Sequence, residues 1–152
     1  MPLKEQISAD IKAAMKAGEA TKLTVLRGLS SVINNKALEK RGKTGDANAA
    51  LTDEEIQTAL ATEAKRRKES AEAFKTGGRQ DLADNELAEL PIIQAYLPKQ
   101  MTQVETETAV AAIMTKTGLK EFGPAMKAVM AELRGKADSA AITEIIKKHL
   151  AA

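Results

Sequence analysis

The densest group of charged side chains in the sequence lies between Glu63 and Leu82. It contains four consecutive cations, Lys65 to Lys68, the residue types that bind the phosphates of nucleic acids. Consecutive residues of a helix are rotated by roughly 100° about its axis, so these four side chains cannot share one face. Acidic residues are interspersed with them, at Glu63, Glu69 and Glu72. We interpret the stretch as a solvated helix with intrahelical ion pairs rather than as a phosphate-binding track.

A second group of cations lies in the last third of the chain. From Lys99 onward there are eight Lys/Arg and six Asp/Glu residues, whereas residues 1–98 carry fifteen of each. Phe122 is the one aromatic residue of this tail, so stacking on unpaired bases is not expected, and any RNA contact would be to the backbone and the helix shape. The cations off the apolar stripes are the candidate nucleic-acid-binding residues: Lys127, Arg134, Lys136, Lys147 and Lys148.

Other chemistry has little support in the sequence. There is no cysteine, and the single histidine, His149, lies at the end of the chain, so an activated nucleophile with a positioned base is not expected. The acids Asp53, Glu54 and Glu55 lie in a predicted first helical turn, where capping explains them better than metal binding. We predict no catalytic residue, no metal site and no cofactor.

Several residues of the charged stretch have a predicted structural role. Arg67 occupies a position where the pattern of its helix calls for an apolar side chain, and Glu63 lies one turn earlier. Either the two residues form a partly buried ion pair, or the aliphatic stem of Arg67 packs on the core while its guanidinium extends to water. Gly78, with Gly77, ends the helix; Arg79 and Asp81 then serve as capping groups of the next helix or as a recognition patch, capping being the simpler role.

The elements that position these residues are all predicted to be helices. Apolar residues at four-residue steps predict a helix from Leu3 to Met15, and a second helix fades near Leu38, before a loop-like stretch over residues 40–51. Capping boxes at Thr52–Glu55 and Thr102–Glu105 begin two further helices. Pro91 falls inside another helix, where we expect a kink rather than two short segments.

No run alternates apolar and polar residues over a strand length, so the predicted fold class is all-α. We predict a multi-helix N-terminal domain, residues 1–98, and a small three-helix bundle, residues 99–152, with the boundary at Leu97-Pro98. Hydrophobic residues make up 43% and charged residues 29%, as in folded soluble proteins. No apolar run approaches the length of a membrane span, and the N-terminus lacks the apolar core of a signal peptide. We therefore expect a cytoplasmic protein without a membrane partner.

The ordered motifs resemble those of the YqeY family across essentially the whole chain. In the first part they are Leu26-Arg27, Glu63-x-Lys65-x-Arg67-Lys68-Glu69-Ser70, Phe74, Gly78-Arg79-Gln80-Asp81-Leu82, Glu89-Leu90 and Tyr96-Leu97-Pro98. In the tail they are Gly123, Met126, Val129-Met130, Gly135-Lys136-Ala137-Asp138 and the segment Ile146 to Leu150. The departures from the family pattern are Pro91, the extended loop of residues 42–50, and Ser139 in place of glycine.

The resemblance implies a three-helix domain similar to the tail of the GatB subunit of the tRNA-dependent amidotransferase, which grips tRNA. It links the chain to translation and to carbon–nitrogen ligase activity with glutamine as amido-N-donor. The sequence has no counterpart of the catalytic domain, and kinship of fold does not confer activity. We expect a non-catalytic, tRNA-associated helical module. The alternative is a protein–protein interaction module that binds an amidotransferase or another translation factor.

Overall fold

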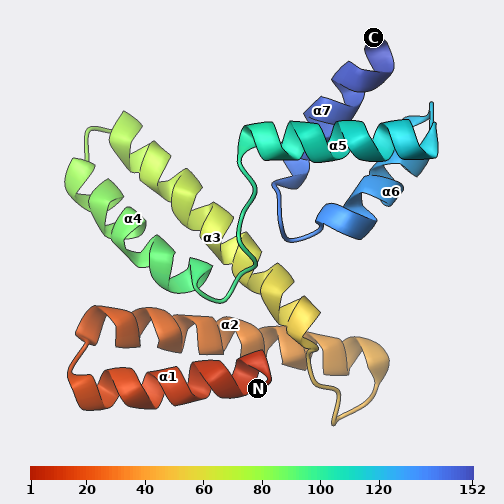
Figure 1. Cartoon of the computed structure of the whole chain (residues 1–152). Helices are drawn as coiled ribbons and strands as arrows, with labels where there is room; N and C mark the ends of the chain where they lie inside the picture. The colour runs from red at the N-terminus through yellow and green to blue at the C-terminus, as the bar shows by residue number, and fades with distance from the viewer. The chain divides into compact units, whose positions relative to one another are not determined.

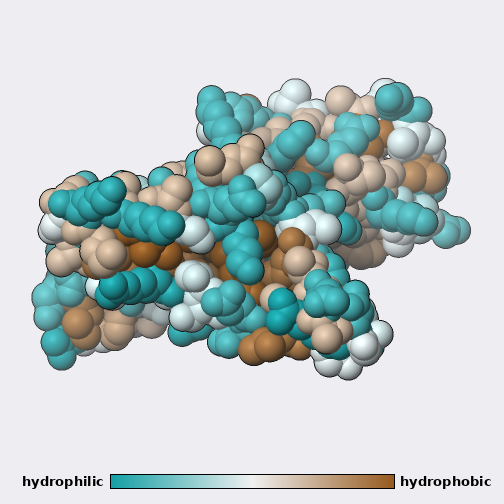
Figure 2. Space-filling view, turned by 90° about the horizontal axis from the view of Figure 1, so that it is seen from below, coloured by the Kyte–Doolittle hydropathy of each residue, from teal (hydrophilic) through white to brown (hydrophobic).

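Seven α-helices and no strand make up the computed structural model, which describes all residues from Met1 to Ala152 (Figure 1). The prediction of an all-α fold is therefore confirmed. The chain folds as two compact units, Met1–Leu97 with four helices and Pro98–Ala152 with three. No helix is long and apolar enough to cross a membrane. Polar side chains (teal) cover most of the face drawn in Figure 2, with apolar patches (brown) between them.

The first unit begins with a hairpin of two helices, α1 (Leu3–Ala17) and α2 (Ala20–Thr44) (Figure 1). Gly18 ends α1 with a φ of 72°, a left-handed conformation that costs glycine little. The α1 side chain of Ile7 and the α2 side chains of Leu26, Leu29 and Ile33 are buried in one apolar core. The apolar spacing thus predicts most of the buried faces of both helices, but Met15, the last residue of the predicted stripe of α1, is 55% exposed.

The second helix is longer than predicted, since α2 continues to Thr44 instead of fading near Leu38. Glu39 accepts hydrogen bonds from Lys36 at 3.1 Å and from Lys43 at 2.7 Å, and such pairs one turn apart stabilise a helix. The loop that follows is held from α2 as well. Arg41 donates through Nε to the carbonyl of Ala49 at 2.9 Å, and Lys40 donates to that of Ala50 at 3.0 Å.

A second hairpin, α3 (Asp53–Thr76) and α4 (Gln80–Gln94), completes the first unit. The predicted capping box is present: the Glu55 amide donates to Thr52 Oγ1 at 3.2 Å, and the Thr52 amide donates to Glu55 Oε2 at 2.8 Å. Gly77 ends α3, and Gly78 turns the chain with a φ of 75°. The two helices pack along each other and share the core with the first hairpin through Ile56, Leu60, Leu90 and Ile93, and Tyr96 in the turn after α4 joins the same core.

Proline 91 does not divide the fourth helix, which runs without interruption from Gln80 to Gln94. In a regular helix the missing amide of residue 91 would donate to the carbonyl of Leu87. Leu87 is 42% exposed and Pro91 is exposed, so water can reach the carbonyl that is left without its helical partner. The Pro91 carbonyl still accepts from the Ala95 amide at 3.1 Å.

The second unit packs three short helices around one apolar core: α5 (Gln103–Thr117), α6 (Phe122–Leu133) and α7 (Ser139–Ala151) (Figure 1). The predicted capping box at Thr102 and Glu105 begins α5. One backbone contact ties the start of α5 to the α6–α7 turn, because the Met101 amide donates to the Lys136 carbonyl at 2.8 Å. The fully buried core residues come from all three helices: Val110, Ala125, Val129, Ile142 and Ile146.

Candidate nucleic-acid interface

The five cations predicted to bind nucleic acid are all exposed on the second unit. Lys127 lies in α6, Arg134 is the C-cap residue of α6, and Lys136 follows in the turn before α7. Lys147 and Lys148 lie in the last two turns of α7. Each side chain is exposed because the apolar residues between these cations, such as Val129, Leu133 and Ile146, take the buried positions.

Two of the five cations share one firmly held turn. Arg134 and Lys136 are two residues apart, and the backbone around them is fixed by hydrogen bonds within the unit. The Arg134 amide donates to the Met130 carbonyl at 3.1 Å, and Gln100 Nε2 donates to the Gly135 carbonyl at 2.8 Å. A fixed backbone lowers the entropy cost of holding two long cationic side chains at a ligand. This turn is the part of the interface that the fold orders best.

The other cations are distributed along the helices. Lys127 lies seven residues before Arg134, hence on the same side of α6 and about 10 Å away along its axis. Lys147 and Lys148 lie near the opposite end of α7 from the turn, about 12–14 Å along the helix from Ser139. They point about 100° apart around the axis. The five side chains therefore form an extended surface with one local pair rather than a single cluster.

Ion pairing differs sharply between the two units. In the second unit, Lys147 is the one cation of eight in an ion pair, with Glu144 Oε1 at 3.9 Å. In the first unit at least eight of fifteen cations are paired. An exposed cation that is not in an ion pair can bind a phosphate without first giving up a carboxylate partner. The second unit is therefore the better anion-binding surface, as its net charge of +2 also indicates.

The predicted pair between Glu63 and Arg67 is not formed. Glu63 pairs with Arg66 instead, at 3.4 Å between Oε1 and Nη1. Arg67 reaches across the hairpin to two carboxylates of α4, contacting Glu86 at 3.2 Å and also bonding Glu89. The two acids are 19 and 22 residues away in sequence. Helical spacing indicates neighbours on one helix only, so it predicts a pair with the residue one turn away and not with residues of the next helix. Arg67 is at the edge of the core as predicted, but its partners are different.

The predicted corner after α3 is present, but Arg79 does not cap α4 with its side chain. Arg79 is the N-cap residue and makes no side-chain cap bond. Its guanidinium pairs with Asp81 instead, at 3.2 Å from Nε and 3.1 Å from Nη2, and this hydrogen bond holds the pKa of Asp81 below its usual range. Asp81 lies in the first turn of α4, where a carboxylate suits the positive end of the helix, while the Leu82 amide donates to the Arg79 carbonyl at 3.1 Å. Both side chains of the pair, Arg79 and Asp81, are exposed, and Gly78 directly precedes Arg79 in the chain.

The four consecutive cations of α3 do not form a track. Lys65, Arg66 and Lys68 are exposed, whereas Arg67 turns towards α4 and is engaged there. Arg66 is paired with Glu63. This distribution follows from the rotation of roughly 100° between successive positions of a helix.

Comparison with known proteins places the chain beside one family. The family model described as Yqey-like protein matches residues 4–150. The chain is 34% identical to "Altered inheritance of mitochondria protein 41, mitochondrial" of Lachancea thermotolerans, over 80% of this chain and 62% of that protein. It is 38% identical to the protein of the same name from Eremothecium gossypii, over 60% of this chain and 46% of that protein. A third, from Pyrenophora tritici-repentis, is 28% identical over 97% of this chain and 80% of its own length.

These names correct one prediction. The relatives are mitochondrial proteins by name, which contradicts the cytoplasmic location expected from the sequence. That expectation depended on composition and on the absence of a signal-peptide core, and composition does not differ in kind between aqueous compartments. The alignments with the first two relatives also span less than two thirds of those proteins, at 62% and 46% of their lengths.

Proposed function

This chain belongs to the YqeY family, and on that premise we propose that it is a non-catalytic helical module whose C-terminal unit binds the backbone of tRNA. The observation that carries the proposal is the exposed, largely unpaired set of cations on that unit. Its most ordered part is the turn with Arg134 and Lys136, and Lys127, Lys147 and Lys148 extend it. The likeness of this unit to the tail of the amidotransferase GatB subunit makes tRNA the proposed nucleic acid.

The chemistry of the surface favours backbone contact over base recognition. Lysine and arginine release counterions from phosphates when they bind, and this electrostatic contribution is independent of sequence. Phe122, which is 39% exposed, is the one aromatic side chain of the unit, so it offers no platform for a series of stacked bases. The proposed role in carbon–nitrogen ligase chemistry is accordingly to present tRNA to an amidotransferase, with glutamine-dependent amide transfer occurring elsewhere.

A filter-binding titration of the whole chain with total tRNA at two salt concentrations tests this function. We expect binding at micromolar protein that weakens as salt rises, by roughly 0.7–0.9 of a logarithmic unit per tenfold salt for each phosphate contacted. Replacing Lys127, Arg134, Lys136 and Lys148 by glutamine should abolish most of the binding and reduce the salt dependence. The matched control replaces four exposed cations of the first unit, Lys4, Lys12, Lys16 and Lys68, by glutamine and changes the net charge equally.

The two quadruple variants separate local binding from non-specific attraction. Equal losses in both would mean that only net charge matters, and the C-terminal site would be rejected. Absence of salt-sensitive binding by the unaltered chain would reject tRNA binding itself. In that case, a protein partner that co-purifies after RNase treatment would support the alternative function, an interaction module for an amidotransferase or another translation protein.

A further inference from the structure

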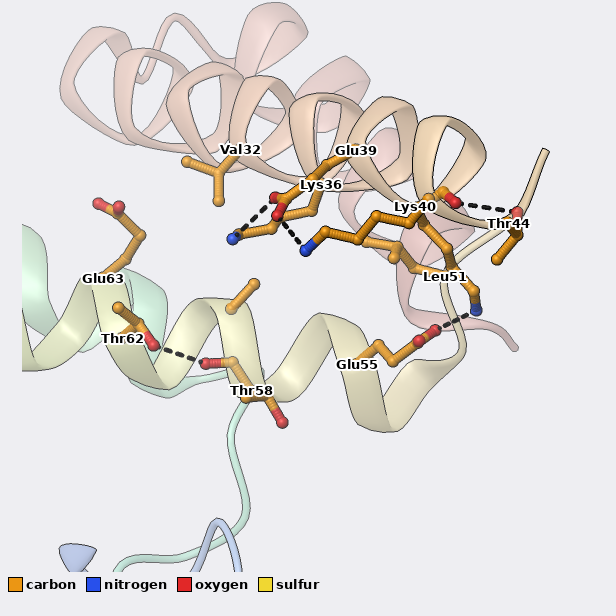
Figure 3. Close-up of a pocket in the computed structure, with 12 residues that line it drawn as sticks. Val32, Lys36, Glu39, Lys40, Thr44, Leu51, Glu55, Thr58, Thr62 and Glu63 are labelled. Carbon is orange, nitrogen blue, oxygen red and sulfur yellow. Dashed lines mark hydrogen bonds and ion pairs between the residues drawn. The ribbon is translucent and has the colours of Figure 1, made fainter. Parts of the chain in front are cut away.

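A groove of about 620 Å³ lies within the first unit, between the second half of α2 and the first half of α3 (Figure 3). It begins beside Val32 and Glu63 and ends at Thr44 and Leu51, where the loop between the two helices closes it. From Val32 to Thr44 the helix rises about 18 Å. The volume of the groove is in the range of protein binding sites, and the proposed tRNA surface does not include the groove.

The lining of the groove is more apolar than its residue types indicate. Val32, Leu51 and Ala59 supply carbon surface directly. The flanking threonines do so as well, because each hydroxyl is bonded to its own helix. Thr58 donates to the Glu54 carbonyl at 3.0 Å and Thr62 to that of Thr58 at 3.1 Å. With their hydroxyls engaged in this way, these side chains add methyl groups to the α3 wall.

A row of three lysines follows the α2 side of the groove, at Lys36, Lys40 and Lys43. The spacing of four and then three residues places them along one face of the helix. Lys36 and Lys43 share a single carboxylate, that of Glu39, and both remain mostly exposed, with side-chain exposures of 56% and 74%. The groove is also lined by Glu55 and Glu63 of α3, and each of these is paired with another cation, Glu55 with Lys40 and Glu63 with Arg66. Glu39 alone therefore serves both Lys36 and Lys43, and this part of the α2 rim keeps an excess of positive charge. Lys40 pairs with Glu55 at 2.7 Å and closes the loop end.

We propose that this groove binds an amphipathic helix of a partner protein, with an apolar stripe against Val32, Leu51 and Ala59 and acidic residues beside Lys36 and Lys43. Two helices that border an apolar channel with one charged rim are the arrangement that helix-in-groove recognition uses. A span of about 18 Å accommodates three turns of helix, with apolar anchors at positions i, i+4 and i+7.

The open side of the groove favours a helix over a small amphiphile. The residues that line the channel all belong to α2, α3 and the loop between them, so within the first unit no third helix lines it. A small ligand is bound tightly when most of its surface is buried, which this shape does not provide. An amphipathic helix needs cover on its apolar face only and keeps its polar face in water. Charge complementarity with the lysine rim then selects acidic over basic helices.

The proposal does not depend on the tRNA function, since the groove and the cationic surface belong to different units of the chain. Its test uses a fluorescein-labelled peptide of fourteen residues, designed to be helical, with leucine at three successive anchor positions and glutamate beside them. Fluorescence anisotropy with the whole chain measures binding. A peptide of the same leucine pattern with lysine for glutamate is the charge control, and a scrambled peptide is the amphipathicity control.

We expect the acidic peptide to bind at least tenfold more tightly than the basic and scrambled peptides. K36E together with K43E should remove or reverse the preference between acidic and basic peptides. T62R, which places a bulky cation on the α3 wall, should weaken both amphipathic peptides by at least tenfold. The matched control, K12E with K16E on α1, should change the acidic-to-basic ratio by less than twofold. Circular dichroism of each variant verifies that helix content is unchanged.

The proposal would be overturned by equal binding of the acidic and scrambled peptides, by an unchanged charge preference in K36E/K43E, or by no binding of either amphipathic peptide. Displacement of an environment-sensitive dye by dodecanoate, without binding of the acidic peptide, would assign the groove to a small amphiphile instead and would also overturn it. Binding of the acidic peptide that T62R does not weaken would place the contact outside the groove, with the same consequence.

Discussion

Arg67 lies where the pattern of α3 calls for an apolar side chain, and its structural reason is found on α4. The guanidinium bonds Glu86 and Glu89, which are one turn apart and whose side chains are 23% and 24% exposed. Without Arg67 these two like charges would remain partly buried next to each other. Removing the cation from such a cluster lowers the free energy of unfolding by more than the whole cluster adds to it, because the carboxylates left behind are incompletely solvated.

R67M should therefore lower the free energy of unfolding by about 2 kcal/mol, a value reduced from that of a fully buried pair because water reaches all three side chains. Urea unfolding followed by circular dichroism measures the change. K75M is the control on the same helix: Lys75 and its partner Glu72 are 51% and 76% exposed, and we expect a change within about 0.5 kcal/mol. Adding E86Q and E89Q to R67M should recover part of the loss. Equal effects of R67M and K75M would contradict the assigned role.

Tyr96 joins the end of α4 to α1 through its hydroxyl, which donates to Asp10 Oδ2. The residue is 7% exposed. Burial, and then the hydrogen bond to Asp10, raise the pKa of the Tyr96 phenol above its ordinary value of 10.0. The folded state therefore favours the protonated phenol. Its contribution to stability is complete below the unfolded pKa and is lost as pH rises above that value.

Tyr96 is the only tyrosine and there is no tryptophan, so the phenolate absorbance reports this one group. In an alkaline titration the native chain should ionise at higher pH than the urea-unfolded chain, and ionisation should accompany the loss of helix measured by circular dichroism. D10N removes the carboxylate and should move the native midpoint towards that of the unfolded chain. Equal titration midpoints for the native and unfolded chains would show that the Tyr96 phenol is not buried and hydrogen-bonded to Asp10 in solution.

At the scale of elements, the segment between α2 and α3 is held by one carboxylate with two functions. Glu55 accepts from the Thr52 amide in the capping box and from Lys40 of α2 at 2.7 Å. The Lys40 hydrogen bond, followed by that of the Thr52 amide, lowers the pKa of Glu55 from its ordinary 4.5. The depressed pKa means that this contribution to stability is present above the unfolded pKa and is lost as pH falls through the folded one.

A carbon-detected NMR titration of the Glu55 carboxyl should therefore give a midpoint below 4.5. In K40M the midpoint should rise part of the way back, because the larger cause is removed while the Thr52 amide remains. K22M, which removes an exposed lysine paired with Glu19 instead, should leave the Glu55 midpoint where it was. A K40M midpoint identical to that of the unaltered chain would mean that the helix–loop contact is absent in solution.

Over the whole molecule, charge is used differently in the two units. The first unit balances fifteen cations with fifteen anions and engages many of them in pairs that connect its helices and loops, such as Arg67 with Glu86 and Lys40 with Glu55. The second unit holds its helices together by apolar contacts of residues such as Val129, Ile142 and Ile146, and keeps its cations at the surface. The proposed functions follow this difference: a phosphate-binding surface on the second unit and a groove for an acidic helix on the first.

Local interactions made much of the fold predictable from the sequence. The capping boxes at Thr52 and Thr102, the glycine stop at Gly78 and most of the buried stripe of α1 all depend on residues within one or two helical turns of each other. The family followed from ordered motifs over the whole length. The candidate cations were correctly predicted to lie off the buried faces, because the apolar period of each helix assigns them there; their binding to tRNA stays a proposal.

The features that only the tertiary structure decided depend on residues far apart in the chain. The partners of Arg67 are on the next helix, the extension of α2 is held in part by the loop beyond it, and the groove exists because α2 and α3 border one channel. The periodicity and spacing of residues within one helix do not predict how two helices pack against each other. The sequence by itself therefore determined the helices, most of their ends and their family. The packing of the helices determined which charged residues meet and where an open groove remains.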